Sequence, residues 1–179
     1  MKQAIAILAS IFTLAACAGK PVPVEPVSDF DVQDYLGTWY EIARLDHSFE
    51  RGLSNVTANY SFRDDGKIRV INRGFDAEKG SYDEAEGKAK FAEDETTGAL
   101  KVSFFGPFYG NYIIFELDRP DYQYAFVSGG TEDYLWLLAR DPEVSDDVRQ
   151  AFLTEAAALG YDTDALIWVD QSRSMDAQP

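Results

Sequence analysis

The chain has 179 residues and a formal net charge of −15, enough length for one well-packed domain and hardly for two. The acidic balance argues against nucleic acid as a partner and against adhesion to an anionic bilayer through a basic patch. With a single cysteine the chain cannot form an internal disulfide, so packing must hold the fold. Aromatic residues make up 14% of the chain, and they favour strands and bury large apolar areas.

The chain begins with a short apolar leader. Lys2 supplies a positive charge ahead of an apolar run at residues 4–16. The run is too short to span a bilayer, which takes about 20 residues. Leu14-Ala15-Ala16-Cys17 then places small residues directly before the cysteine and resembles the lipobox of bacterial lipoproteins.

This resemblance implies cleavage after Ala16 and lipidation of Cys17. Acyl chains hold a protein stably on a membrane when two or more are present. Ala18, which follows the cysteine in place of Asp, implies sorting to the outer membrane. We therefore expect residues 1–16 to be a signal peptide and the mature protein to be anchored at the bacterial outer membrane, facing the periplasm. An ordinary secretory leader with a chance cysteine is the alternative.

A proline-rich segment follows the cysteine. Residues 18–28 contain three prolines, which favour extended polyproline II and forbid a helix. At about 3.1 Å per residue, the segment could hold a domain some 30 Å from the bilayer or let it lie on the surface. We predict a lipidated cysteine and tether at residues 17–29, a domain at 30–171 and a flexible tail at 172–179.

Short runs of period-two alternation begin near Tyr35, separated by Gly, Pro, Asp or Asn, as is typical of a meander or barrel. Asp64-Asp65-Gly66 indicates a hairpin turn between the second and third runs. The eight predicted strands lie at 38–46, 54–63, 67–75, 82–92, 99–105, 111–118, 122–128 and 133–140.

The pattern changes to helical spacing after the eighth run. Val148, Phe152 and Ala156 recur on one face, Ser145 is a suitable N-cap, and Gly160 follows the end. We predict a helix at 145–159 and a last short strand at 166–169. The strand at 133–140 is apolar on both faces, so it needs one partner inside the sheet and another outside, and the helix can be the outer one.

Three motifs in order resemble those of the lipocalins. They are Gly37-Thr38-Trp39 with the following Tyr40-Glu41-Ile42, then Glu132-Asp133-Tyr134, then Arg140. Together they make the chain similar to bacterial outer-membrane lipocalins, relatives of apolipoprotein D. The resemblance implies an all-β fold: an eight-stranded antiparallel up-and-down barrel with one C-terminal helix on its flank. It also implies a cavity for lipids such as fatty acids or lysophospholipids, and an arginine, Arg140, stacked over Trp39 at the closed end.

If Trp39 and Arg140 face inward, side-chain parity along the strands predicts which residues face the lumen. Each of these is a candidate ligand contact, or alternatively a side chain that simply fills the barrel. We assign Trp39 and Arg140 to fold closure. The candidate ligand contacts are Ala58, Tyr60, Val70, Val102, Phe104, Ile113, Phe115, Tyr124, Phe126, Trp136 and Leu138.

The connections after the first, third, fifth and seventh strands are expected at the open end of the barrel. That end would carry Phe49 near His47, the turn at 76–81, the loop at 106–109 and Gly129-Gly130. The aromatic residues around the third of these connections form an apolar lip that could touch a bilayer, a ligand tail or a second copy in a homodimer; alternatively they fold back over the lumen. They are Phe105, Phe108 and Tyr109.

Glu41 shares parity with Trp39 and could point inward, where it would orient a ligand head group or be satisfied by a tyrosine or arginine. Few inward positions other than Arg140 carry Lys or Arg. A ligand head group should therefore stay at the open end, and neutral or zwitterionic lipids such as lysophospholipids should suffer less repulsion than fatty acids.

The sequence contains few of the residues and motifs that enzymes use for catalysis. His47 is the single histidine, and the chain has no free cysteine after lipidation and no Gly-x-Ser-x-Gly turn. No dinucleotide, phosphate-loop or metalloprotease motif is present, so we expect no cofactor, no metal and no enzyme activity. The sequence predicts a carrier or store for lipids. An envelope interaction protein with a filled barrel and a lipid-modifying enzyme that uses carboxylates stay open.

Overall fold

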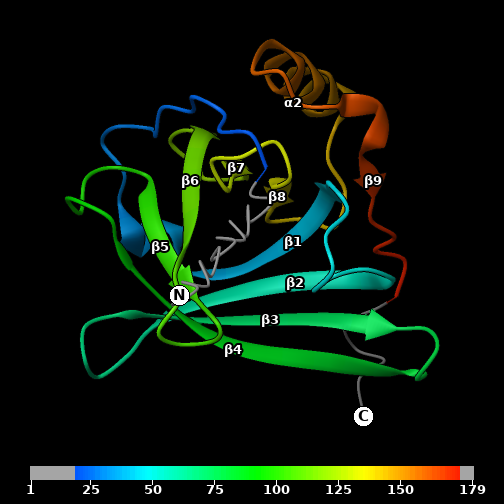
Figure 1. Cartoon of the computed structure of the whole chain (residues 1–179), viewed down its shortest axis with the longest axis horizontal. Helices are drawn as coiled ribbons and strands as arrows, with labels where there is room; N and C mark the ends of the chain where they lie inside the picture. Colours follow the sequence, from blue (N-terminus) through cyan, green and yellow to red (C-terminus); the bar gives the residue numbers. More distant parts are fainter. Residues whose placement is uncertain (1–18, 174–179) are drawn as a thin grey trace, which may run out of the picture.

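The computed structural model describes residues 19–173, in which eight strands form a closed antiparallel barrel (Figure 1). Each strand pairs with the next, and β1 pairs with both β8 and β2, which closes the ring. The predicted barrel is thereby confirmed. The predicted signal peptide, cleavage site and lipidated Cys17 lie outside the described residues. The strands are β1 (Gly37–Arg44), β2 (Leu53–Phe62), β3 (Ile68–Asp76), β4 (Ser81–Phe91), β5 (Ala99–Ser103), β6 (Gly110–Leu117), β7 (Tyr124–Ser128) and β8 (Leu135–Ala139).

The strand ends differ from the predicted ones where local turns intervene. Tyr122, predicted to lie in a strand, has a positive φ of 52°, and its amide donates to the Asp118 carbonyl at 3.1 Å. This places Tyr122 in a turn, and β7 begins at Tyr124. A short helix, α1 (Val32–Tyr35), was not predicted; the Asp31 side chain caps it by accepting from the Gln33 amide.

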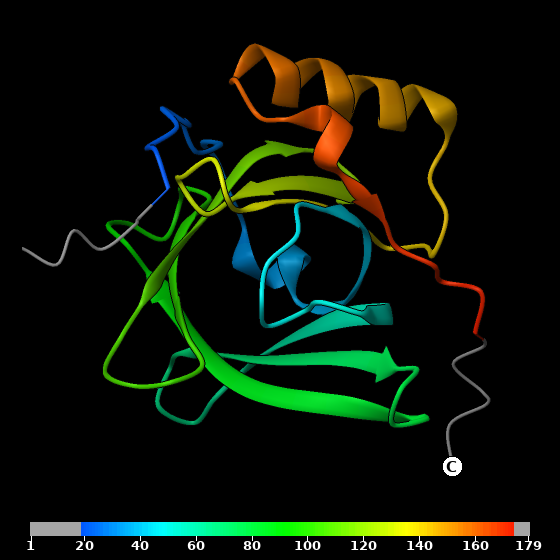
Figure 2. The same ribbon diagram turned by 45° about the vertical axis from the view of Figure 1, so that its right-hand side comes forward.

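Helix α2 (Asp146–Ala158) lies along the flank of the barrel, as predicted (Figure 2). The Ser145 hydroxyl accepts from the Val148 amide at 3.3 Å, which caps the first turn. Gly160 adopts a φ of +89° just after the helix, a conformation that favours glycine. An apolar layer that includes Leu135, Leu137 and Phe152 fills the space between the barrel wall and α2. The helix is therefore the outer partner of β8.

A C-terminal segment closes a gap in the barrel wall. β1 pairs with β2 from Gly37 as far as Tyr40. Beyond Tyr40, the same edge of β1 pairs with β9 (Ile167–Trp168), which follows the 3₁₀ helix η1 (Thr163–Ala165). The Gln171 amide group donates to the carbonyls of Glu41, at 2.8 Å, and Val56, at 2.9 Å, and so bridges the two diverging strands. Ser172 and Arg173 belonged to the predicted flexible tail, but the Arg173 amide donates to the Asn55 side chain at 2.8 Å.

The proline-rich segment lies against the barrel, which corrects the expectation of a free tether. Pro21 forms a bridge with Thr131, and the Val22 amide donates to the Gly130 carbonyl at 3.0 Å. Further along, Val27 exchanges hydrogen bonds with β6 and with Gly98. The segment is extended, as its prolines require, but the barrel supplies partners for its backbone groups. From Lys20 to Val27 it is therefore part of the domain and not a spacer.

Candidate functional site

The floor of the barrel is built around Trp39, which is fully buried. The Arg140 guanidinium lies 4.0 Å from the centroid of the Trp39 ring and donates to the carbonyls of Thr38, at 2.9 Å, and Asp34, at 2.7 Å. The Trp39 indole N–H donates to the Tyr35 carbonyl at 2.8 Å. The structure thus brings together the two residues that the sequence assigned to closure, and ties α1 to both.

Three tyrosines meet above this floor. The Tyr112 hydroxyl lies 2.7 Å from that of Tyr35 and 2.8 Å from that of Tyr60. Burial raises the pKa of all three phenols above the ordinary value of 10, so they are neutral hydroxyls over the physiological range. Tyr60 was a candidate ligand contact; Tyr35 and Tyr112 were not foreseen as lumen residues. The three rings fill the lower part of the lumen.

Seven of the eleven candidate ligand contacts belong to the apolar cluster inside the barrel, together with Trp39. Ala58, Val102, Phe104 and Trp136 among them are only partly buried although they face inward, so solvent reaches part of the interior. The seven are Ala58, Tyr60, Val70, Val102, Phe104, Trp136 and Leu138.

The other four candidates, Ile113, Phe115, Tyr124 and Phe126, lie on the outer face of the barrel, so their predicted orientation is wrong. The last three belong to the layer beneath α2, where the Phe126 ring makes an edge contact with Phe152 at 5.0 Å.

Ile113 is outward because its cross-strand partner is Ser128, whose hydroxyl lies 2.5 Å from that of Tyr161 beyond α2. Phe115, Tyr124 and Phe126 therefore lie on the side of the barrel wall that faces α2. The alternate residues of these strands face inward instead: Tyr112, Ile114, Leu117, Ala125 and Val127.

A buried polar cluster lies at the open end of the lumen. Arg44 donates to the Glu41 carboxylate at 2.5 Å and to the Glu50 carbonyl at 2.9 Å. The Glu50 carboxylate lies 3.0 Å from Nε2 of His47 and accepts from the Trp136 indole N–H at 3.2 Å. The four charged or titratable side chains are each at most 5% exposed. Glu41 does point inward, and an arginine satisfies it.

Arg44 enters the lumen because of a β-bulge. The register of β1 against β8 shifts between Glu41 and Ala43, so that Arg44 pairs with the inward residue Trp136. Simple alternation from Trp39 placed Arg44 outside and Ala43 inside. The expectation that few inward positions other than Arg140 carry a basic residue therefore missed this one.

The two carboxyl groups of the cluster have opposite pKa shifts. Burial and the nearby Glu50 raise the pKa of Glu41 well above its ordinary value of 4.5. Burial also opposes ionisation of Glu50, but hydrogen bonds from His47 and Trp136 and the charge of His47 outweigh it and lower the Glu50 pKa. The cluster therefore places two carboxyl groups with opposite pKa shifts beside two basic side chains, those of Arg44 and His47.

The loop at residues 45–52, between β1 and β2, folds across the open end of the barrel (Figure 2). Its His47 and Glu50 point down into the polar cluster, while Phe49 is exposed and its ring stacks on His47 at 4.0 Å. Phe49 thus lies near His47 at the open end, as expected. We call this segment the 45–52 lid.

The predicted aromatic lip is split. Phe105 and Phe108 are 80% and 79% exposed, so they do not fold back over the lumen. Tyr109 instead lies against the outer wall, where its ring faces Lys88 and Lys90.

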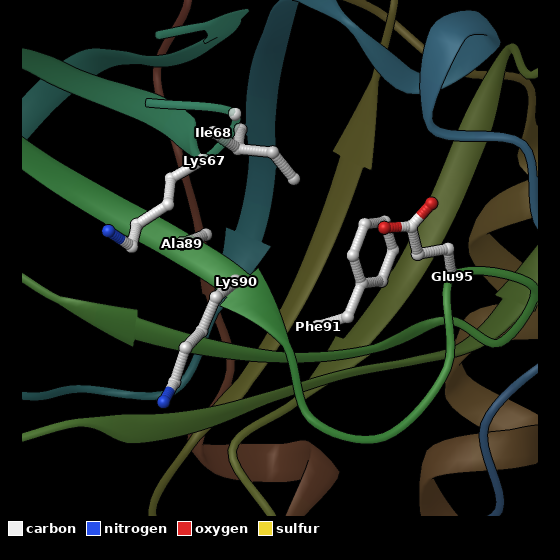
Figure 3. Close-up of a pocket in the computed structure, with 7 residues that line it drawn as sticks. Lys67, Ile68, Ala89, Lys90, Phe91 and Glu95 are labelled. Atoms are coloured by element: carbon white, nitrogen blue, oxygen red, sulfur yellow. The ribbon is translucent and has the colours of Figure 1, made fainter. Parts of the chain in front are cut away.

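A pocket of about 210 Å³ lies near the closed end, between the hairpins that join β2 to β3 and β4 to β5. Figure 3 shows Ile68 and Phe91, both from the interior cluster, directed toward it, while Lys67 and Lys90 extend to the other side. A second pocket, of about 250 Å³, is lined by Arg63 just after β2, by residues 86–88 of β4, and by Ser103, Phe104 and Gly106 at the end of β5 and in the loop that follows. Neither includes a residue of the 45–52 lid.

Among residues 19–173, no group of three or more histidine, cysteine, aspartate or glutamate side chains is placed to hold a metal ion. In the same part of the chain, no helix has the length and apolar character needed to cross a membrane.

Comparison with known proteins identifies the fold as a familiar one. A family model described as "Lipocalin-like domain" matches residues 30–171. The "Outer membrane lipoprotein Blc" of Vibrio cholerae is 56% identical, over 96% of this chain and 99% of its own length, and that of Escherichia coli K12 is 50% identical, over 95% and 97%. Insecticyanin from the tobacco hornworm has the same fold, with a TM-score of 0.69, 24% identity and 89% of each chain covered. The chain belongs to the lipocalin family.

Proposed function

We propose that this lipocalin is anchored at the bacterial outer membrane and holds the acyl chain of a lipid in its barrel, for storage or transport in the cell envelope. The relatives at 56% and 50% identity are both named outer membrane lipoproteins, which supports the location. The lipobox-like residues before Cys17 support the anchor.

The observation that carries the ligand class is the polarity gradient along the lumen. Apart from the three tyrosine hydroxyls above the floor, the inward side chains of the lower and middle lumen are apolar and include Ala58, Val70 and Val102. Near the open end, the polar cluster retains three buried nitrogen atoms that make no hydrogen bond among the described residues: Nε of Arg44, Nδ1 of His47, and Nε2 of His47, which lies 3.0 Å from the Glu50 carboxylate. An amphipathic molecule matches this gradient, with its tail among the apolar residues and its polar group beneath the lid.

Entry of such a ligand requires the 45–52 lid to move. The lid and the hydrogen bonds of Arg44 and Trp136 occupy the open end, and the tyrosine hydroxyls span the lower lumen. Ligand binding then exchanges these internal contacts for contacts with the lipid, so the affinity depends on their difference.

Among lipids, we propose a preference for lysophospholipids over fatty acids. In the polar cluster the Glu41 and Glu50 carboxyl groups already contact Arg44 and His47, and the protein as a whole is acidic at −15, which disfavours a free carboxylate as head group. A zwitterionic head group avoids this repulsion. The protein acts as a binding protein, and lipids leave it chemically unchanged.

Two measurements test this function. Titration with matched lysophosphatidylethanolamine and fatty acid at low salt should give tighter binding of the former, and a clear fatty-acid preference would overturn the head-group assignment. Native mass spectrometry of protein taken gently from its host should show a co-purifying intact lipid. Cleaved lipid would indicate an enzyme, whereas no lipid and no binding in the titration would indicate a filled barrel with an interaction role.

A further inference from the structure

Two phenylalanines stand out at the open end of the barrel. Phe105 and Phe108, in the loop between β5 and β6, expose 80% and 79% of their surface. By contrast, Phe62 near the closed end exposes 43%. Large apolar side chains at a loop tip are unfavourable in water and gain by entering an apolar phase. The two exposed rings therefore favour binding of this loop to an apolar phase or surface.

Basic residues gather on the barrel wall beside this loop. Lys90 on β4 pairs across strands with Lys101 on β5, and Lys88 lies on the same outer face. Like charges directly opposite each other destabilise a sheet. Among residues 19–173, no carboxylate lies within 4.0 Å of any of the three ammonium groups. The next acidic residue along β4, Glu86, is already paired with Arg63 and Arg69.

The aromatic loop and the lysines form one continuous surface. The Tyr109 ring, at the end of the loop, lies 5.0 Å from the Lys90 ammonium group and 5.9 Å from that of Lys88. Lys101 donates to the Asn111 side chain at the start of β6. We call Lys88, Lys90, Lys101, Phe105 and Phe108 the lysine–phenylalanine surface.

The N-terminal segment reaches the barrel at the same end. Gly19 packs against Asp133, and Lys20 pairs with Glu132 at 3.4 Å, both in the connection between β7 and β8. That connection adjoins the start of β6, because a Cβ on Gly130 would lie 3.1 Å from the Asn111 amide nitrogen. Only Ala18 separates Cys17 from Gly19, so at full extension the two residues are at most about 7 Å apart.

We propose that the lysine–phenylalanine surface docks on an anionic phospholipid bilayer, with the open end of the barrel beside the membrane. This orientation rests on the proposed function for its anchor at Cys17, because a lipidated Cys17 holds this end within reach of the head groups. The two phenylalanines enter the bilayer interface and the three lysines contact lipid phosphates. A lipid can then pass between the bilayer and the barrel with a short path through water.

Charge distinguishes a lipid surface from a second copy of the chain as the occupant. A copy carries the same charge of −15, so two copies repel each other as a whole. An anionic bilayer also repels the protein at long range, but screening limits that repulsion to about 8 Å at physiological salt. In the proposed docking, the attraction between the three lysines and the lipid phosphates outweighs at contact the long-range repulsion expected from the net charge.

The test uses the mature chain, residues 17–179, with Cys17→Ser, which contains every described element but cannot be acylated. Its binding to mixed phosphatidylcholine–phosphatidylglycerol vesicles is measured by sedimentation at low and at physiological salt. Phe105→Ser/Phe108→Ser should weaken binding tenfold or more. Lys88→Gln/Lys90→Gln/Lys101→Gln should weaken it about fivefold per lysine and abolish the preference over pure phosphatidylcholine vesicles.

Matched controls are Phe62→Ser and Arg119→Gln, exposed residues near the closed end and outside the lysine–phenylalanine surface, which should bind as the parent does. Equal binding by all variants, or no binding by the parent, would overturn the proposal. So would a dimer in sedimentation equilibrium that Phe105→Ser/Phe108→Ser dissociates without changing vesicle binding. Lysophosphatidylethanolamine titration without vesicles separates the two proposals: loss of ligand binding with vesicle binding intact removes the proposed function only.

Discussion

Glu41 and Arg44 show how single residues set the character of the lumen. Alternation from Trp39 places Glu41 inside, the bulge after Glu41 brings Arg44 to the same side, and Arg44 donates to the Glu41 carboxyl group, with Glu50 nearby. Burying such groups is costly unless all are paired, so the cluster is stable only in a restricted set of protonation states. Its pH dependence follows from the shifted carboxyl groups.

Glu41→Gln should make the protein less sensitive to rising pH. Because the pKa of Glu41 is raised in the folded state, the unfolded chain loses this proton first, and stability falls as pH rises from about 4.5 toward the folded value. Glutamine cannot ionise but still accepts from Arg44. Above that window the variant should be more stable relative to the wild type than it is near pH 4.5.

Urea unfolding at pH 5, 6.5 and 8 measures this difference. Glu50 acts in the opposite sense, because its lowered pKa contributes stability that is lost only as pH falls below about 4.5, and both proteins share that loss. Glu84→Gln, at an exposed position of β4, is the control. Parallel pH profiles for wild type and Glu41→Gln would contradict the assignment.

Residue-level prediction from the sequence succeeded where strands alternate regularly. Ala58, Tyr60 and Val70 on β2 and β3 face inward as parity requires. It failed for Phe126, because β7 is apolar on both faces and only the position of α2 decides which face is outside. The inward orientation of Arg44 was not predicted, because a β-bulge cannot be recognised from the hydrophobic pattern of the sequence.

In the proposed function, access to the lumen depends on the 45–52 lid. Beyond Leu45, which is buried and bonded to Leu135, a small number of hydrogen bonds hold the lid: Arg44 donates to the Glu50 and Leu53 carbonyls, and Trp136 donates to the Glu50 carboxylate. The rings of His47 and Phe49 also contact Tyr134 and Trp136. Elements held by a small number of hydrogen bonds open at lower free energy than the core strands. The lid is therefore suited to open while the barrel stays folded.

Trp136→Phe should loosen the lid without disturbing the barrel, because phenylalanine keeps an aromatic ring but lacks the N–H that bonds Glu50. Hydrogen bonds to charged groups contribute about 1.5–3 kcal/mol, so amide exchange at Glu50 and Leu53 should accelerate about tenfold or more. Hydrogen exchange read by mass spectrometry measures it. Trp168→Phe, at a partly exposed tryptophan of β9, should leave both amides unchanged. Equal protection in all three proteins would show that Trp136 does not hold the lid.

At the level of elements, the sequence predicted the eight strands and α2 because their periodicity is long and regular. It did not predict α1, which has only four residues and depends on its Asp31 cap and on Arg140 for its position. The bound proline-rich segment was also missed. Its extended conformation is local, but its partners, such as Gly130, are distant in sequence.

The whole molecule places its proposed ligand entrance, the start of its described N-terminal segment and its exposed aromatic residues Phe105 and Phe108 at one end. Lys20 and Pro21 contact the connection between β7 and β8, next to the loop that carries Phe105 and Phe108. The closed end, with Trp39 and Arg140, faces away. This arrangement follows from strand direction, which sets odd-numbered connections at one end, and from the path of the N-terminal segment along the wall.

Lysophospholipid affinity of a lumen-filled variant tests the central claim most directly. Ala58→Phe adds a ring inside the barrel, whereas Ser61→Phe adds the same ring on the outer face of β2; urea unfolding first establishes that both are folded. Calorimetric titration with lysophosphatidylethanolamine should show binding at least about tenfold weaker for Ala58→Phe, a loss of about 1.4 kcal/mol or more, and unchanged binding for Ser61→Phe. Wild-type affinity in a folded Ala58→Phe protein would contradict the claim that the acyl chain lies in the lumen.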